Sequence, residues 1–182
     1  TYVEIWARIL NAAYDSYYSL SSKKDVKNFL LYLKFSLQIE RIFSIQQMCK
    51  ILNFMGLEYS DIIDKKKLNN VGNEPEHQDT DHLNRKRLLY KENTNVFAYY
   101  ILTSVLINNY YYFLLWCAKN NANIYNFSRT NSSTQSFTKF ITEQFGDPSL
   151  FKAINYLWKK LKSKREDKYL LYTTRMSAIE IV

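Results

Sequence analysis

The sequence is poor in residues that interrupt helices, with only 3 glycines and 2 prolines among 182 residues. Sharp turns are therefore scarce, and we expect long helices. The sequence also has only 2 histidines and 2 cysteines, which leaves few groups for acid–base or nucleophilic catalysis. A glycine-rich phosphate loop and a nucleophile elbow are both missing. We therefore expect a non-enzymatic protein without a cofactor.

The two histidines lie in one short acidic segment. His77 and His82 are five residues apart, with Glu76 and Asp81 beside them. Histidine pairs that bind zinc from one helix are spaced by three or four residues, which this segment does not provide. We expect a solvated loop here and no metal site.

Both cysteines lie within apolar patterns of helical spacing. Cys49 and Cys117 are therefore expected to be reduced and buried, as small apolar side chains of a core. A reducing compartment fits this pattern. The chain starts at Thr1 without a basic-then-apolar leader, so we expect it to be a fragment of a longer protein.

Apolar and basic residues are abundant instead. Hydrophobic residues make up 47% of the chain and aromatic residues 16%, more than a disordered chain carries. With 25 Lys and Arg against 17 Asp and Glu, the net charge is +8, which favours acidic partners such as nucleic acid, acidic lipid headgroups or an acidic protein. The length suits a single domain over residues 1–182.

Apolar residues at three- and four-residue spacing predict a series of helices. The first runs from Tyr2 to Tyr18, and the second begins near Ser22 and Asp25 and reaches Ile39. A third is expected to start at Ser44, because Gln47 completes a capping box, and to stop at Gly56. Further helices are predicted at 61–67, as two buried helices within 95–118, before Gly146, and from Asp147 and Pro148 onward.

Two polar segments are predicted to be loops, at residues 69–86 and 120–136. The segment 168–182 mixes β-branched and aromatic residues, which is typical of a short hairpin or another helix. Together these elements predict an all-α fold of stacked helical hairpins, either a helical repeat or a bundle.

One stretch without charge, 95–118, is long enough to cross a bilayer. Against a membrane span, Thr103, Ser104, Asn108 and Asn109 fall in its middle, where hydrocarbon would leave their polar groups unsatisfied. A membrane is therefore an unfavoured partner, and a membrane-associated fragment is kept as a further alternative.

Two basic segments, 65–67 and 159–168, are candidates for contact with nucleic acid or an acidic partner. The second of them lies beside Trp158 and Tyr169, and basic residues next to aromatic rings are found where phosphates and stacked bases are bound. A plain alternative is that its charges complement the negative end of a helix. The candidate contact residues are Lys65, Lys66, Lys67, Lys159, Lys160, Lys162, Lys164 and Arg165.

Tyrosines form the candidate protein interface. Tyrosine offers a large contact area at a low cost in side-chain entropy. The candidate interface residues are Tyr17, Tyr18, Tyr110, Tyr111 and Tyr112.

Several short patterns over roughly the first 115 residues resemble those of a known family. Leu89-Tyr90-Lys91-Glu92-Asn93 is followed by Asn95, by Phe97-Ala98-Tyr99 and by Ile101-Leu102. Weaker likenesses are Trp6, Arg8 and Asp15 in the first helix, and Val26, Leu30, Leu31 and Leu33 before Phe43-Ser44-Ile45-Gln46-Gln47. These patterns are similar to the helical region of the Sac/GANP family, scaffold subunits of the transcription-coupled messenger-RNA export complex.

The resemblance implies stacked helical hairpins that lead to a PCI-type winged-helix end. It also implies assembly with a second PCI-domain protein and a small acidic subunit, contact with RNA or DNA, and a nuclear rather than cytoplasmic location. It implies no active site. The leading expectation is therefore a helical scaffold in a multi-subunit assembly, and the alternative is a nucleic-acid-binding domain that uses the basic segments 65–67 and 159–168.

Overall fold

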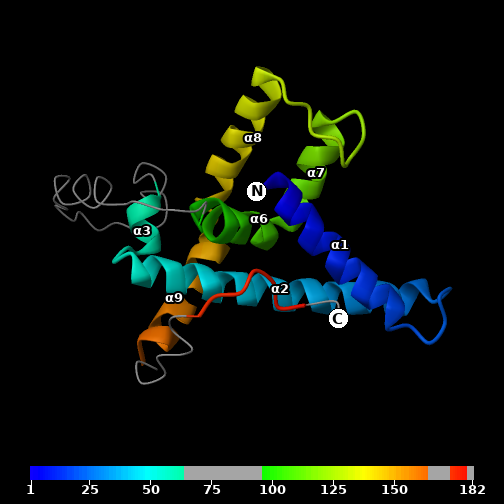
Figure 1. Cartoon of the computed structure of the whole chain (residues 1–182), viewed down its shortest axis with the longest axis horizontal. Helices are drawn as coiled ribbons and strands as arrows, with labels where there is room; N and C mark the ends of the chain where they lie inside the picture. The colour runs from blue at the N-terminus through cyan, green and yellow to red at the C-terminus, as the bar shows by residue number, and fades with distance from the viewer. Residues whose placement is uncertain (64–95, 164–172, 180–182) are drawn as a thin grey trace.

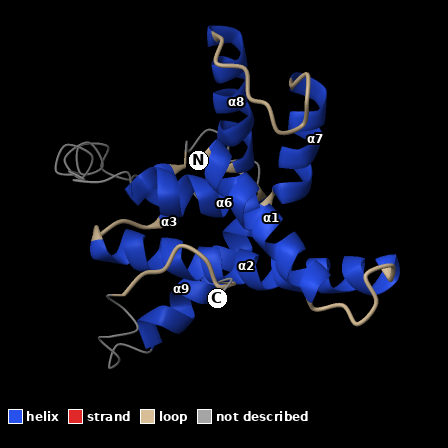
Figure 2. Ribbon diagram, turned by 45° about the vertical axis from the view of Figure 1, so that its right-hand side comes forward, coloured by secondary structure: helices blue, strands red, loops and turns tan. Residues whose placement is uncertain are grey.

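The part of the chain that the structure describes is mainly helical. The computed structural model describes residues 1–63, 96–163 and 173–179, and no strand occurs in these ranges. Figure 2 shows helices connected by loops. The all-α prediction is therefore confirmed. The elements are α1 (Tyr2–Tyr18), α2 (Val26–Phe54), α3 (Tyr59–Ile62), the π-helix η1 (Phe97–Leu102), α6 (Thr103–Asn108), α7 (Tyr110–Asn120), α8 (Asn131–Gln144) and α9 (Pro148–Ser163).

The longest element is α2, which has 29 residues and contacts most of the other helices. In Figure 1 it runs across the width of the molecule, with α1 on one part of it and α9 crossing another. Asp25 caps its start, because Oδ1 of Asp25 accepts a hydrogen bond from the N–H of Asn28 at 3.0 Å. Gly56 follows its end with a φ of 66°, which confirms the predicted left-handed stop.

The predicted break between Ile39 and Ser44 is wrong. No glycine or proline lies between Asp25 and Gly56, so nothing interrupts α2. The Ser44 hydroxyl does not cap a helix start, and it donates to the carbonyl of Arg41 one turn earlier at 2.8 Å.

Ser44 instead forms a contact between α2 and α6. Its Oγ accepts hydrogen bonds from Oγ of Ser104 at 3.3 Å and from Nδ2 of Asn108 at 3.2 Å. Ser44 and Ser104 are both buried, and their small side chains allow the two helices to approach each other closely.

Two apolar cores form along α2 and share α2 and α6. The first core also takes residues from α1, α7 and α8, and the second from α3, η1 and α9. The first consists of Ile5, Trp6, Ile9, Ala12, Leu37, Leu106, Ile107, Phe113, Trp116, Cys117, Phe137 and Phe140. The second consists of Ile45, Met48, Cys49, Leu52, Tyr59, Ile63, Ile101, Val105, Leu150 and Ile154.

The uncharged stretch forms the two consecutive buried helices that the sequence predicts. Helical residues Phe97–Asn108 and Tyr110–Asn120 meet at Asn109 with a bend of 90°. Val105 and Phe113, one from each side of the bend, are completely buried within the helical cores. Among the described residues, no single helix is long and apolar enough to cross a membrane, whereas this bent pair passes that test by length and composition alone.

The loop predicted at 120–136 is shorter than expected. Helix α8 already begins at Asn131, and its cap is Thr130, whose Oγ1 accepts from the N–H of Ser133 at 3.2 Å. Thr134 and Thr138 then donate to the carbonyls four residues earlier at 3.0 and 2.9 Å. Their hydroxyls are thus satisfied within the helix, which is why a polar composition did not prevent a helix here.

The predicted start of the last helix is confirmed. α9 begins at Pro148, and Oδ1 of Asp147 accepts a hydrogen bond from the N–H of Ser149 at 2.9 Å. The helix places Leu150 and Ile154 in the second core.

The end of the chain departs from the prediction of a hairpin or a further helix. Residues 173–179 form neither, and lie as an irregular segment along α2 (Figure 1). Residues 168–172 and 180–182, the loop predicted at 69–86 and the lysines at 65–67 lie outside the described residues. The winged-helix end that the resemblance implies stays a prediction.

Both cysteines are free and buried, as predicted. Burial raises the pKa of the Cys49 thiol from 9.0 to about 12. Burial likewise raises the pKa of Cys117 and raises that of Tyr2 from 10.0 to about 12. The Tyr2 ring lies in the first core, with its centroid 5.5 Å from that of Phe113.

We predict that the free energy of unfolding decreases as the pH rises from about 8 to about 10. Cys49 keeps its proton in the folded state but loses it in the unfolded chain above its ordinary pKa of 9.0, so alkaline pH favours unfolding. Urea midpoints measured across this range should fall, and should fall less steeply in Cys49→Ala. A midpoint independent of pH would contradict the buried thiol.

Candidate interaction surfaces

The first half of α2 carries a row of large apolar side chains that face solvent. Leu31, Phe35, Ile39 and Ile42 are spaced by three or four residues, so they lie along one side of the helix. Their exposed fractions are 60%, 67%, 38% and 49%. In Figure 1 this part of α2 extends beyond the helices that pack on its second half. We call these four residues the α2 stripe.

The other side of the same half-helix is already used for packing. Leu37 is buried in the first core, and Leu33 packs against that core. The α2 stripe is therefore a second apolar surface on one helix and is not needed to attach α2 to the rest of the fold. Contiguous exposed apolar side chains of this kind mark interaction surfaces in folded proteins.

The surroundings of the α2 stripe are basic. Lys27 and Lys34 are exposed on the same half of α2, and Lys23 and Lys24 lie in the turn before it. Between residues 19 and 35 the sequence has these four lysines and only one acidic residue, Asp25. The surface therefore combines an apolar centre with a positively charged edge.

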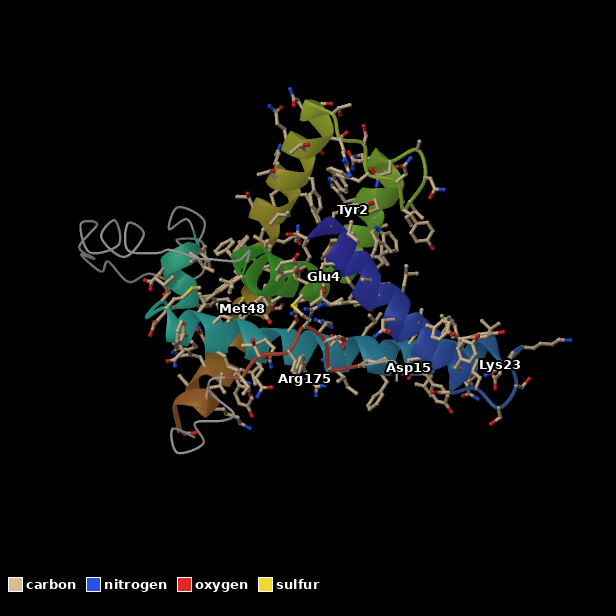
Figure 3. All side chains as sticks on the ribbon, viewed as in Figure 1. Tyr2, Glu4, Asp15, Lys23, Met48 and Arg175 are labelled. Carbon is tan, nitrogen blue, oxygen red and sulfur yellow. The ribbon has the colours of Figure 1, made fainter. Side chains whose placement is uncertain are left out.

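Tyr17 and Tyr18, two of the predicted interface residues, lie near the turn between α1 and α2. They are 41% and 58% exposed. The Nζ atom of Lys23 lies 5.2 Å from the centroid of each ring. It also donates to the carbonyls of both tyrosines and of Leu20 at 2.9 to 3.0 Å. Lys23, labelled in Figure 3, therefore caps the end of α1 and orders these rings.

The three tyrosines predicted at the start of α7 belong to a different place. Tyr111 and Tyr112 are 61% and 57% exposed, whereas Tyr110 is half-buried against the first core. α7 lies beside the start of α1, as the contact between Tyr2 and Phe113 shows, and Tyr17 lies at the opposite end of α1. The structure thus does not join the predicted tyrosines into one surface.

Only part of the predicted basic surface is described. Lys159 and Lys160 are exposed on α9, and Nζ of Lys160 lies 4.8 Å from the ring centroid of Tyr156, which is itself 59% exposed. α9 packs on the second half of α2, so this pair is separate from the α2 stripe. Lys65, Lys66, Lys67, Lys164, Arg165 and the side chain of Lys162 lie outside the described residues.

Sequence reasoning missed how residues 173–179, which we call the strap, bind to α2. The strap runs antiparallel to α2, because its first residues lie at the end of α2 and its last near the middle. Nζ of Lys50 donates to the carbonyl of Thr173 at 2.9 Å. The N–H of Arg175 donates to Oε1 of Gln47 at 3.2 Å. Figure 3 shows Arg175 beside α2.

Glu40 is the central residue of this contact. Its Oε1 accepts three hydrogen bonds, from the hydroxyl of Ser177 at 2.6 Å and from the N–H groups of Ala178 and Ile179 at 2.8 and 2.7 Å. Its Oε2 lies 3.8 Å from Nη1 of Arg8 on α1. Glu40 and Arg8 are only 1% and 4% exposed. The buried carboxylate thus connects α1, α2 and the strap.

A signal for this contact is present in the sequence. Glu40, Gln47 and Lys50 interrupt the apolar pattern of α2 at steps of seven and three residues, which places them near one side of a helix. Polar residues repeated on one side of an otherwise apolar helix indicate a polar partner. The sequence alone does not identify that partner as the chain's own residues 173–179.

Within residues 1–63, 96–163 and 173–179, no three His, Cys, Asp or Glu side chains come close enough to hold a metal ion. His77 and His82 lie outside these ranges.

Comparison of the chain with protein-family models, with curated proteins and with solved structures found no match.

We predict that Glu40→Gln lowers the free energy of unfolding by about 3 kcal/mol, because it removes the negative charge that neutralises the buried guanidinium of Arg8. Glu4→Gln is the matched control, since Oε1 of Glu4 also lies 3.5 Å from Arg8 but the Glu4 side chain is 24% exposed. That variant should cost less than about 1 kcal/mol. Equal urea midpoints for the two variants would contradict a structural role for Glu40.

Proposed function

We propose that this chain is a non-enzymatic helical scaffold that docks another protein on the α2 stripe. The observation that supports this proposal is the exposure of Leu31, Phe35 and Ile42 on a helix whose other side is already packed. Covering an exposed Leu, Ile or Phe side chain contributes about 1.5–3 kcal/mol each. The α2 stripe can therefore supply several kcal/mol of binding free energy without a change of fold.

The chemistry of the surface defines the kind of partner. A straight row of apolar side chains on a helix suits the apolar face of an amphipathic helix, which packs along it. Lys27 and Lys34 beside the row favour acidic residues at the edge of that helix. We infer a partner helix with an apolar centre and an acidic edge.

A second copy of this chain suits the surface less well. Two copies that meet through the α2 stripe would bring Lys23, Lys24, Lys27 and Lys34 of each copy toward the same interface. Like charges placed together at an interface oppose association. The charge distribution therefore favours a different protein over self-association.

The resemblance to the Sac/GANP family agrees with this proposal in its general class, because that family also acts through assembly with other subunits. A role in messenger-RNA export and a nuclear location stay predictions that rest on this resemblance. Nucleic-acid binding through the end of α9 stays the alternative, supported by the exposed pair Tyr156 and Lys160.

Site-specific crosslinking tests the proposal directly. We predict that a photoreactive benzoylphenylalanine in place of Phe35, in the full chain and in the cells that make it, forms one discrete adduct with a protein. The same adduct should also form when a cell lysate is irradiated at high salt, since apolar contacts are not screened. It should disappear when Leu31 and Ile42 are both changed to Ser. Tyr111 is the matched control position, because it is exposed to a similar extent on α7.

Two results would contradict the proposal. The first is an adduct at position 111 with none at position 35, which would move the interface to the tyrosines of α7. The second is the absence of a protein adduct at both positions together with salt-sensitive binding of single-stranded RNA that is lost in Lys159→Glu/Lys160→Glu. That result would favour the nucleic-acid alternative.

A further inference from the structure

The strap lies on a set of polar side chains that bind main-chain atoms. Gln47 accepts from an N–H of the strap, Lys50 donates to a carbonyl, and Glu40 accepts from two consecutive N–H groups. From α1, Nδ2 of Asn11 donates to the carbonyl of Ile179 at 2.7 Å. We call Asn11, Glu40, Gln47 and Lys50 the strap site.

Recognition of main-chain atoms places few demands on the sequence of the bound segment. The N–H groups of Ala178 and Ile179 both reach Oε1 of Glu40, so the strap bends there, because successive N–H groups of an extended strand point to opposite sides. Any segment that bends in the same way offers the same N–H and C=O groups. The strap site also recognises the side chain of Ser177. The Ser177 hydroxyl donates to Oε1 of Glu40 at 2.6 Å, and a contact of 2.9 Å to the carbonyl of Ile179 folds the segment around it.

The attachment of the strap is mostly polar. Ile179 is its only residue that packs against an apolar core, and the seven strap residues are all partly or largely exposed. Segments with few buried apolar contacts open locally at a lower free energy than the core does. The strap is therefore expected to leave its site without unfolding the helices.

The two oxygens of Glu40 have different partners. Oε1 accepts all three donors of the strap, whereas Oε2 lies 3.8 Å from Nη1 of Arg8 on α1. The carboxylate that binds the strap is therefore also held by a residue outside the strap.

We propose that the strap site is a binding site for short peptide segments of other proteins, and that residues 173–179 occupy it as an intramolecular substitute. The ligand is a segment that bends as the strap does, with a serine or threonine, two following residues that are not proline, and an apolar side chain at the second of them. This pattern reproduces Ser177, Ala178 and Ile179, which provide the three donors to Glu40 and the one apolar anchor.

This site is distinct from the α2 stripe. Glu40, Gln47 and Lys50 are buried beneath the strap, whereas the residues of the α2 stripe are exposed to solvent. One helix thus offers an apolar surface to a partner helix and a polar surface to a partner peptide. Either proposal can fail without the other, since Phe35 does not belong to the strap site.

The test uses the full chain with the strap displaced. Ala178→Pro/Ile179→Pro removes both N–H donors to Glu40, and circular dichroism verifies that the helices remain. A fluorescent synthetic peptide with the sequence of residues 173–179 should bind this variant on the order of tenfold or more tighter than it binds the wild-type chain. In the wild type, the attached strap competes at a high effective concentration.

Two matched controls define the site. Binding should be lost when Glu40→Gln is added to the displaced chain, and also when the peptide carries the proline equivalent to Ala178→Pro. Hydrogen exchange of the wild-type chain gives an independent readout, in which the amides of Ala178 and Ile179 should exchange at least about tenfold faster than core amides of α2. A folded variant that fails to bind the peptide, or strap amides that exchange only with global unfolding, would overturn the proposal.

Discussion

The fold depends on the continuity of α2. A single helix of 29 residues contributes Leu37 to the first core and Ile45, Met48, Cys49 and Leu52 to the second. α6 is the other helix common to both cores, and it reaches α2 through the small side chains Ser44 and Ser104. If α2 broke at its middle, the two cores would lose their common support. Its uninterrupted course follows from the lack of glycine and proline between Asp25 and Gly56.

The functional surfaces are also consequences of this helix. A helix that packs on one side only has polar residues on its other sides. α2 differs, because it buries Glu40 and Gln47 under the strap and exposes Phe35 and Leu31 to solvent. Exposed apolar and buried polar side chains both oppose the ordinary preference of a folded chain. Both are explained if α2 serves contacts beyond the helices packed on it, and among the described residues the strap is a contact of this kind.

The sequence predicted the helices well where caps and periodicity agreed. Tyr2–Tyr18 was predicted correctly from apolar periodicity alone. The stop at Gly56 and the start at Pro148 were predicted correctly because an apolar pattern ended or began beside a residue that favours a helix end. The break at Ser44 was wrong because Ser44 and Gln47 resemble a capping box but serve tertiary contacts, with α6 and the strap. Local patterns do not distinguish these two uses of a polar residue.

The interaction surfaces were harder to predict. Periodicity predicts a helix here from its apolar residues, but it cannot tell which of those residues are buried, because that depends on where α1 lies. Phe35 and Leu33 have similar hydrophobicity, and only the packing of α1 makes one exposed and the other covered. The strap was missed for a related reason, since its contacts join residues more than one hundred positions apart.

The continuity of α2 can be measured by pulsed electron paramagnetic resonance. Spin labels at Lys27 and Asn53, both exposed and both within α2, would be separated by 26 residues. At a rise of 1.5 Å per residue, the account predicts a single narrow distance distribution centred near about 39 Å. A much shorter or broad distribution would show that α2 is interrupted, and would contradict the arrangement of cores, α2 stripe and strap site that is described above.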